Sequence, residues 1–205
     1  MDKTALEFGR YYHIYNRGNN SETLFKAPEN YRYFLSLYMK YIDPVADTLA
    51  YCLMSNHIHL VIRTKEERDV RSFEELHLFD TNRKGLKTDR KPTPSHQFAH
   101  LFNAYSKAIN KNYDRTGSLF EHPFERRMID NEHYLQSSIS YTHYNPVKAG
   151  IADSLTGYTW SSYNALISDK PTHMNRELVM AIFGSRDHFI LYHGDEPEGM
   201  GFEKM

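Results

Sequence analysis

Alternation of apolar and polar positions predicts a strand-rich first half of the chain. A segment rich in aromatic and β-branched residues spans 11–16, and the turn signal Arg17-Gly18-Asn19-Asn20 follows it. Two further extended segments, 47–54 and 57–63, are separated only by Ser55-Asn56, so we expect them to form a hairpin. A fourth strand is expected within 120–129. Together these segments predict an antiparallel sheet of four or five strands.

Apolar side chains recur at helical spacing in three other segments. The first helix is expected over 28–42, between Pro28 and the Asp43-Pro44 stop, and the second over 98–113. A third helix should begin after Asp130-Asn131 and end at Asn145, because Pro146 disfavours the helical conformation of the residue before it. The element order predicts an α+β fold, a ferredoxin-like (RRM-like) split βαβ with helices on one face of the sheet.

The charged segment 65–95 lacks a clear periodicity and is broken by prolines at 92 and 94. We interpret it as an insertion or mobile segment, with a short helix over 72–79. The expected organisation is one domain over 1–150 that contains this segment, followed by a helical C-terminal extension over 151–205 packed on it.

The composition narrows the class of protein. Apolar residues make up 40% of the chain and aromatic residues 14%, which excludes wholesale disorder. The N-terminal residues lack the pattern of a signal peptide, and no stretch approaches the roughly 20 apolar residues of a membrane span. The single cysteine, Cys52, excludes an internal disulfide and a multi-cysteine zinc site. We therefore expect a cytoplasmic protein without a membrane partner.

Charge is unevenly distributed although the net charge is only −1. Residues 83–127 contain ten Lys or Arg against four acidic residues, a net of +6, whereas 151–205 carry eight acidic against four basic residues, a net of −4. A basic centre fits a phosphate-binding groove. On charge alone, a solvated surface with chance clustering explains the pattern equally well.

The segment Asn56-His57-Ile58-His59-Leu60 carries the sharpest chemistry. Side chains alternate along a strand, so His57 and His59 should share one face, while Ile58, Leu60 and Ile62 point into the core. Two imidazoles about 7 Å apart at Cα can converge on one divalent ion. Magnesium binds imidazole poorly, so an oxygen ligand and a phosphate would complete its shell. With twelve histidines in the chain, a chance pair is the alternative.

The third expected helix supplies a second candidate. Tyr141 and Asn145 are four residues apart and should lie on one helical face, where a phenol nucleophile and an amide ligand could face the same cavity. The chain has 16 tyrosines, and a packing role for Tyr141 is the ordinary alternative.

Five sequence blocks occur in an order that resembles a known family. Together they resemble the single-tyrosine HUH transposases, most closely the REP-associated tyrosine transposases. The resemblance extends over about residues 11–163, and its order makes it specific although His-x-His alone is weak. The blocks are Tyr12-His13-Ile14-Tyr15-Asn16-Arg17-Gly18, Met54-Ser55-Asn56-His57-Ile58-His59-Leu60, Arg115-Thr116-Gly117-Ser118-Leu119-Phe120, Tyr141-Thr142-His143-Tyr144-Asn145-Pro146-Val147-Lys148-Ala149-Gly150 and Trp160-Ser161-Ser162-Tyr163.

The resemblance implies a division of roles among these residues. His57 and His59 would bind a divalent metal ion, Mg²⁺ or Mn²⁺, with Asn145 as a third ligand. Tyr141 would attack single-stranded or hairpin DNA, leaving a 5′-phosphotyrosine and a free 3′-hydroxyl in a DNA transposition reaction. Phosphates are expected to meet five basic residues, Lys107, Lys111, Arg115, Arg126 and Arg127.

One departure from the family pattern bears on DNA contacts. Where the family continues with a glutamine and an arginine-phenylalanine pair, this chain has Glu121-His122-Pro123-Phe124, and Arg126-Arg127 could substitute for the missing arginine. Two other functions stay open: a non-catalytic module that binds single-stranded DNA or RNA, and a metal-dependent phosphodiesterase that activates water. The sequence allows a monomer or a homodimer.

Overall fold

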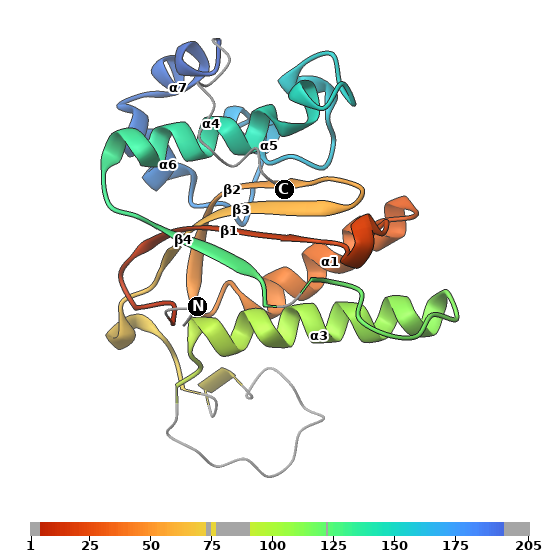
Figure 1. Ribbon diagram of the computed structural model, residues 1–205. Helices are drawn as coiled ribbons and strands as arrows, with labels where there is room; N and C mark the ends of the chain where they lie inside the picture. Colours follow the sequence, from red (N-terminus) through yellow and green to blue (C-terminus); the bar gives the residue numbers. More distant parts are fainter. Residues whose placement is uncertain (1–4, 73–74, 77–90, 122, 195–205) are drawn as a thin grey trace.

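A computed structural model describes residues 5–72, 75–76, 91–121 and 123–194. Its centre is a four-stranded antiparallel sheet in the order β2-β3-β1-β4 (Figure 1). The strands are β1 (Tyr11–Arg17), β2 (Ala46–Leu53), β3 (His57–Thr64) and β4 (Glu125–Ile129). β1 lies between β3 and β4, which is the arrangement of a split βαβ unit. The predicted α+β, ferredoxin-like class is confirmed.

Two helices cover one face of the sheet. These are α1 (Pro28–Tyr41) and α3 (Pro94–Asn112), which contact one another beneath the strands in Figure 1. Ile58, Leu60 and Ile62 of β3 are buried in the same core cluster as Phe34 and Phe98 of these helices. The predicted inward direction of this set on β3 is therefore confirmed.

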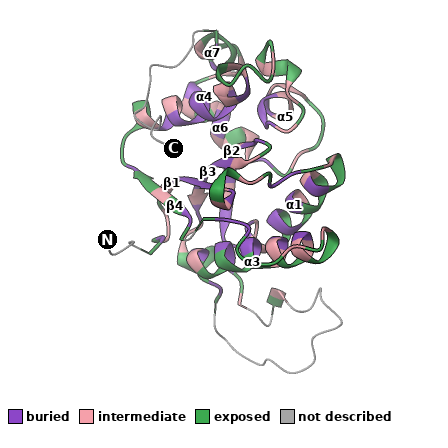
Figure 2. Cartoon of the chain, turned by 45° about the vertical axis from the view of Figure 1, so that its right-hand side comes forward, coloured by how far each residue is buried: buried purple, intermediate pink, exposed green. Residues whose placement is uncertain are grey.

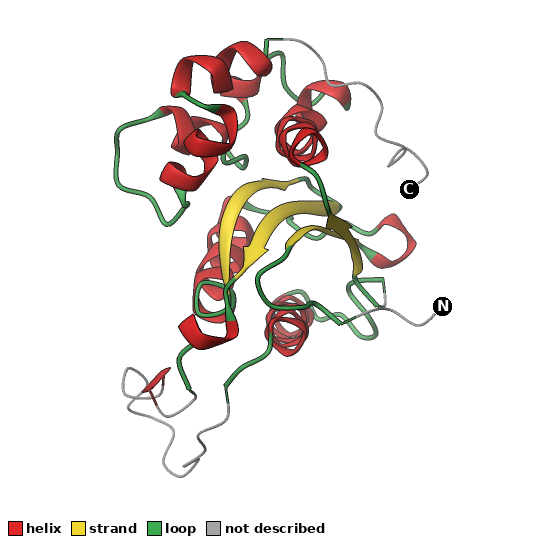
Figure 3. Ribbon diagram, turned by 90° about the vertical axis from the view of Figure 1, so that its left-hand side faces the viewer, coloured by secondary structure: helices red, strands yellow, loops and turns green. Residues whose placement is uncertain are grey.

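The opposite face is also covered, which corrects the expectation of helices on one face only. The covering helices are α4 (Glu132–Lys148), α5 (Tyr163–Ile167), α6 (Arg176–Phe183) and α7 (Arg186–Tyr192), and Figure 3 shows the sheet between the two helical layers. Leu49 on the edge strand β2 and Val61 on the central strand β3 join a second core with Ile139 and Phe189. Strands that are apolar on both faces need cover on both.

The helix α4 runs past Pro146 to Lys148, so the predicted end at Asn145 is wrong. A proline lacks an N–H and costs the helix one bond to the fourth residue before it. At Pro146 this loss falls in the last turn, close to where the helix ends anyway. The Pro146 carbonyl accepts from the Ile151 N–H at 2.8 Å, and Gly150 takes the positive φ of 67° that ends the helix.

The remaining described segments are short. Three 3₁₀ turns, η1 (Asn19–Ser21), η2 (Glu67–Asp69) and η3 (Leu155–Gly157), connect the elements. Residues 73–74 and 77–90 lie outside the described part, so the mobile segment and the helix over 72–79 stay predictions. The division at residue 150 also stays a prediction. Within the described ranges, no helix is long and apolar enough to cross a membrane.

Candidate active site: strand histidines and a helical tyrosine

His57 and His59 share the face of β3 that is covered by α4. The side chain of His59 is buried, that of His57 is half-buried, and their ring centroids lie 5.2 Å apart. Val61, two residues further along β3, belongs to the core beneath α4, which identifies the face. Strand alternation alone thus brings the two imidazoles together.

Tyr141 of the same chain lies beside this pair. It is a buried residue of α4, and its ring stands edge-on to that of His59, with centroids 5.7 Å apart and planes at 88°. The helix reaches this position because α4 crosses over β2 and β3 (Figure 1). The structure therefore places the predicted tyrosine next to the predicted histidines without a second chain.

A third histidine, His13, was not among the predicted site residues. It is fully buried on β1, and its Nε2 lies 3.0 Å from Nδ1 of His59. Its ring also stands edge-on to Tyr141, at a centroid distance of 6.3 Å. Alternation along the Tyr12–Gly18 block shows only which residues share a face with His13. The register of β1 against β3, with His13 opposite Val61, is needed to show that His13 reaches His59.

The ring nitrogens of the pair fit a metal ion. The Asn56 side-chain oxygen lies 2.8 Å from Nδ1 of His57 and accepts a hydrogen bond from its N–H. This leaves the unprotonated Nε2 of His57 as the nitrogen able to bind a metal ion. If Nδ1 of His59 carries its proton and donates a hydrogen bond to Nε2 of His13, Nε2 of His59 is likewise unprotonated and able to bind a metal ion. Burial, reinforced by Arg17, lowers the pKa of His57 to about 4. Burial and then the neighbouring imidazoles hold the pKa of His59 well below its usual value. Metal ligation requires these neutral rings.

A third protein ligand would have to be of another type. In the ranges that the structure describes, no three His, Cys, Asp or Glu side chains gather into a metal-binding group. Asn145 lies one helical turn after Tyr141, and its Nδ2 donates to the Tyr141 carbonyl at 2.8 Å. That bond orients the amide and leaves Oδ1 as the atom able to ligate.

Two arginines lie on the histidine face of the sheet. Arg127, a predicted DNA contact, is exposed on β4 directly opposite His13. Arg17, which was missed, lies opposite His57 at the end of β1 and is 26% exposed at its side chain. Its Nε is 3.6 Å from the Glu121 carboxylate, so the residue that departs from the family pattern partners an arginine beside the site.

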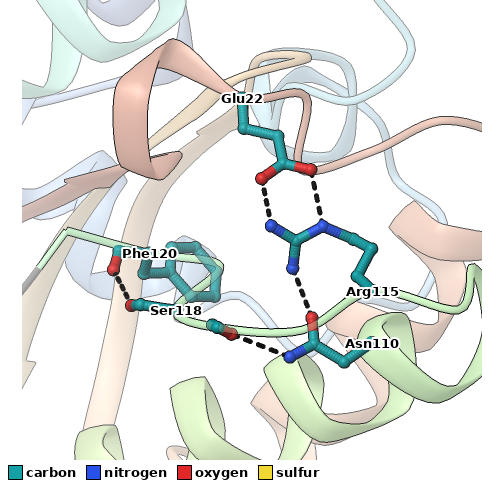
Figure 4. Close-up of polar contacts among 6 residues, drawn as sticks. Glu22, Asn110, Arg115, Ser118 and Phe120 are labelled. Carbon is teal, nitrogen blue, oxygen red and sulfur yellow. Dashed lines mark hydrogen bonds and ion pairs between the residues drawn. The ribbon is translucent and has the colours of Figure 1, made fainter.

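The other predicted DNA contacts lie elsewhere. Lys107 and Lys111 are exposed on α3, on the far side of the sheet from Tyr141. Arg126 points to that same side, with its guanidinium 4.3 Å from the ring centroid of Phe124. Arg115 forms a two-pronged ion pair with Glu22 and also donates to Asn110 (Figure 4). The five predicted cations therefore do not form one surface, and only Arg127 borders the histidine face.

The structure therefore has a ferredoxin-like sheet that brings a histidine pair against a helical tyrosine within one chain. No family model matches the chain. Over 120 residues it is 26% identical to the "Putative REP-associated tyrosine transposase" of Haemophilus influenzae, which covers 58% of this chain and 59% of that relative. The matched region thus spans less than two thirds of the relative's length.

A solved structure of a REP-associated tyrosine transposase bound to a REP hairpin has the same fold. The TM-score is 0.56 at 13% sequence identity, and the match covers 83% of this chain and 87% of that one. The resemblance to the REP-associated tyrosine transposases, first indicated by the five sequence blocks, is confirmed by these two comparisons.

Proposed function

We propose that this protein is a single-tyrosine transposase of the REP-associated type, which cleaves and rejoins single-stranded or hairpin DNA in DNA transposition. The observation that carries the proposal is the edge-on placement of Tyr141 beside His59, 5.7 Å between ring centroids within one chain. A tyrosine held next to a half-buried and a buried histidine can serve as the nucleophile of a covalent phosphoryl transfer, which requires a nucleophile and its activating groups to lie close together. A relative of this name and a fold neighbour bound to a REP hairpin support the choice of DNA as substrate.

The histidine pair would hold Mg²⁺ or Mn²⁺ through the two Nε2 atoms, with Oδ1 of Asn145 as a third ligand. When bound, such an ion withdraws charge from the scissile phosphate and stabilises the negative charge that builds on it. His13 keeps Nε2 of His59 available by accepting from Nδ1, and Asn56 does the same for His57.

The covalent step belongs to Tyr141. Its phenolic oxygen forms a bond to phosphorus while the bond from phosphorus to the 3′-oxygen breaks. The phenol loses its proton and the departing 3′-oxygen gains one, so no water is consumed. The bond energy is kept in the phosphotyrosine, and another 3′-hydroxyl can reverse the step. This conservation is what makes strand transfer possible rather than hydrolysis alone.

Arg17 and Arg127 are the cations that we assign to the DNA backbone next to the site. Both occupy strand positions on the histidine face, opposite His57 and His13 respectively. Cations at such positions neutralise phosphates and set the register of the strand, while the sequence is read by other contacts.

Incubation with a single-stranded hairpin oligonucleotide and Mn²⁺ tests the proposal. Wild-type protein should form a covalent adduct that survives denaturing electrophoresis, and Tyr141→Phe should form none while binding the hairpin with unchanged affinity. Tyr134→Phe, on the first turn of the same helix, is the matched control and should keep the adduct. Adducts from Tyr141→Phe would refute the nucleophile. Cleavage without any adduct would instead favour the water-activating phosphodiesterase, and binding that is indifferent to EDTA without cleavage would favour a binding module.

A further inference from the structure

The helix that carries Tyr141 has a polar buried surface. Ser138, Ser140, Thr142 and His143 of α4 are all buried, and Figure 2 shows the helix buried along much of its length. The hydroxyls of Ser138 and Thr142 donate to carbonyls of their own helix, at 2.7 and 2.8 Å, so they anchor α4 to nothing else. Apolar packing is non-directional. The rotation of α4 about its axis is therefore fixed in part by the polar side chains that reach out of it. Gln136, Ser137 and Tyr144 contact the Ile182 carbonyl, the Tyr192 hydroxyl and the His193 carbonyl from less buried positions, and His143 makes the buried contacts.

His143 reaches out of the helix with both ring nitrogens. Its Nε2 lies 2.8 Å from the hydroxyl of Ser162, and its Nδ1 lies 2.9 Å from Nε2 of His193. Ser162 belongs to the segment that pairs with the edge strand β2, since its N–H donates to the Tyr51 carbonyl at 3.0 Å. His193 directly follows α7. One side chain thus joins the nucleophile's helix to the sheet edge and to the last described helix.

The donors and acceptors in the series of hydrogen bonds from the Phe189 carbonyl through His193 and His143 to Ser162 follow from that one carbonyl. The Phe189 carbonyl, 2.8 Å from Nδ1 of His193, can only accept, so His193 carries its proton on Nδ1 and accepts on Nε2. His143 must then donate from Nδ1 and accept from the Ser162 hydroxyl on Nε2. The Ser162 oxygen in turn accepts from the Tyr51 N–H at 2.9 Å. Both rings are neutral in this arrangement, and the Ser162 hydroxyl also lies 3.3 Å from the Tyr51 carbonyl, a second and more distant acceptor.

We infer that His193 is a positioning residue for the nucleophile, which locks α4 through His143 and so sets the place of Tyr141 against His59. The inference rests on the proposed role of Tyr141, which lies two residues from His143 on α4. Losing the His193 acceptor leaves the buried His143 N–H without its partner, and the helix must shift or rotate to satisfy it. A displacement of about 1 Å at a reacting atom can cost roughly 100-fold in rate.

Two amide substitutions separate the lock from general packing. His193→Asn places a donor near the former Nδ1, facing Phe189, but is too short to reach His143. His193→Gln places its side-chain oxygen near the former Nε2 and restores an acceptor for His143. His188→Asn, exposed on the same helix, is the matched control. For each variant we would measure the single-turnover rate of adduct formation with a saturating hairpin oligonucleotide and Mn²⁺. The Kd for the oligonucleotide and the Kd for Mn²⁺ would be measured separately.

We expect His193→Asn to slow adduct formation about 10- to 100-fold, while the Kd for DNA and for Mn²⁺ changes less than about twofold. His193→Gln should recover the rate to within about fivefold, and His188→Asn should match wild type. An Asn variant within threefold of wild type would overturn the inference. So would a parallel loss of DNA or Mn²⁺ affinity, or a Gln variant as slow as Asn.

Hydrogen exchange distinguishes failure of the inference from failure of the proposed function. Amides of α4 around 138–145 should exchange faster in His193→Asn, while those of α1 and α3 keep their wild-type protection. If wild-type protein forms no Tyr141-dependent adduct, the proposed function is overturned and the exchange pattern alone judges the lock. Unchanged protection of α4 in His193→Asn would then refute it.

Discussion

The ion pair between Glu22 and Arg115 allows a quantitative test of the fold around the site. Glu22 lies in the connection from β1 to α1, and Arg115 in the connection from α3 to β4 (Figure 4). Arg115 Nε donates to Oε1 at 2.5 Å, Nη2 donates to the second carboxylate oxygen, and the side chains are only 12% and 31% exposed. We predict that this pair is energetically coupled, unlike an ordinary surface pair.

The size of the coupling follows from the burial of the two groups. Glu22→Gln leaves a nearly buried guanidinium without its anion, so we expect unfolding to become easier by about 2–3 kcal/mol. Arg115→Gln leaves a carboxylate that water can still reach, for a loss of about 1–2 kcal/mol. The double variant removes both charges together, so its loss should fall short of the sum by about 1–2 kcal/mol.

Urea unfolding of the four proteins, at one pH and low salt, measures this double-mutant cycle. Equal m-values are required, so that the differences report stability alone. A coupling energy below about 0.5 kcal/mol would refute the reasoning, because solvent-exposed ion pairs already give about 0.2–1 kcal/mol. The same result would show that the ion pair of Arg115 is not needed for stability, and Arg115 would again be a candidate for binding DNA phosphates.

Three further predictions concern the site and its surroundings. His13→Leu should weaken Mn²⁺ binding, measured by calorimetry, about 10- to 100-fold, whereas unchanged affinity would show that His59 needs no orienting partner. Arg127→Gln should reduce the slope of log Kd for single-stranded DNA against log salt by about 0.7, while Arg115→Gln leaves it unchanged; equal slopes for the two variants would contradict our placement of the strand. Burial lowers the pKa of His193 to about 4, so the unfolded state binds more protons than the folded state between about pH 6.5 and 4. The stability that neutral His193 contributes is therefore present above this pH window and is lost as the pH falls through it. His193 alone should contribute up to about 1.4 kcal/mol per pH unit to the fall in unfolding free energy there. His193→Gln should therefore show a shallower slope than wild type, and an unchanged slope would refute the assignment.

The sequence predicted what local periodicity controls. The four strands, the three long helices and the opposite directions of His59 and Ile58 follow from spacings of two and of three to four residues. The end of α4 was mispredicted because the rule for residues before proline is statistical, and a proline in a last turn loses only one bond. The sequence predicted α4 and a packed helical extension, but not that they cover the second face of the sheet. The cause of that placement, the apolar residues Leu49 and Val61 facing α4, is shared between strands and is not visible in one segment.

Long-range register explains which site residues escaped prediction. His57, His59 and Tyr141 belong to local motifs, whereas His13 and Arg17 become site residues only when β1 pairs with β3. Arg115 shows the reverse case, a predicted DNA contact that the structure places in an ion pair. Its charge and its place in a basic segment predicted a DNA contact, but the Glu22 carboxylate that engages it lies 93 residues away. A basic residue in a sequence is a candidate for binding DNA phosphates, and only the fold shows whether it already pairs with an acidic residue of the protein.

The two faces of the sheet divide the work of stability and chemistry. The face toward α1 and α3 is filled by aromatic and aliphatic side chains such as Phe34, Phe98 and Ile58, whose burial is the main source of folding energy. In the proposed function, the α4 face holds imidazoles, a phenol and an amide in fixed positions, and directional hydrogen bonds specify such positions more closely than apolar contact alone. Buried histidines on β1 and β3 and the His143–His193 chain provide that fixation through directional bonds. Substitutions in the apolar cores on either face should therefore lower stability first, whereas substitutions of the polar side chains on the α4 face should lower activity before stability.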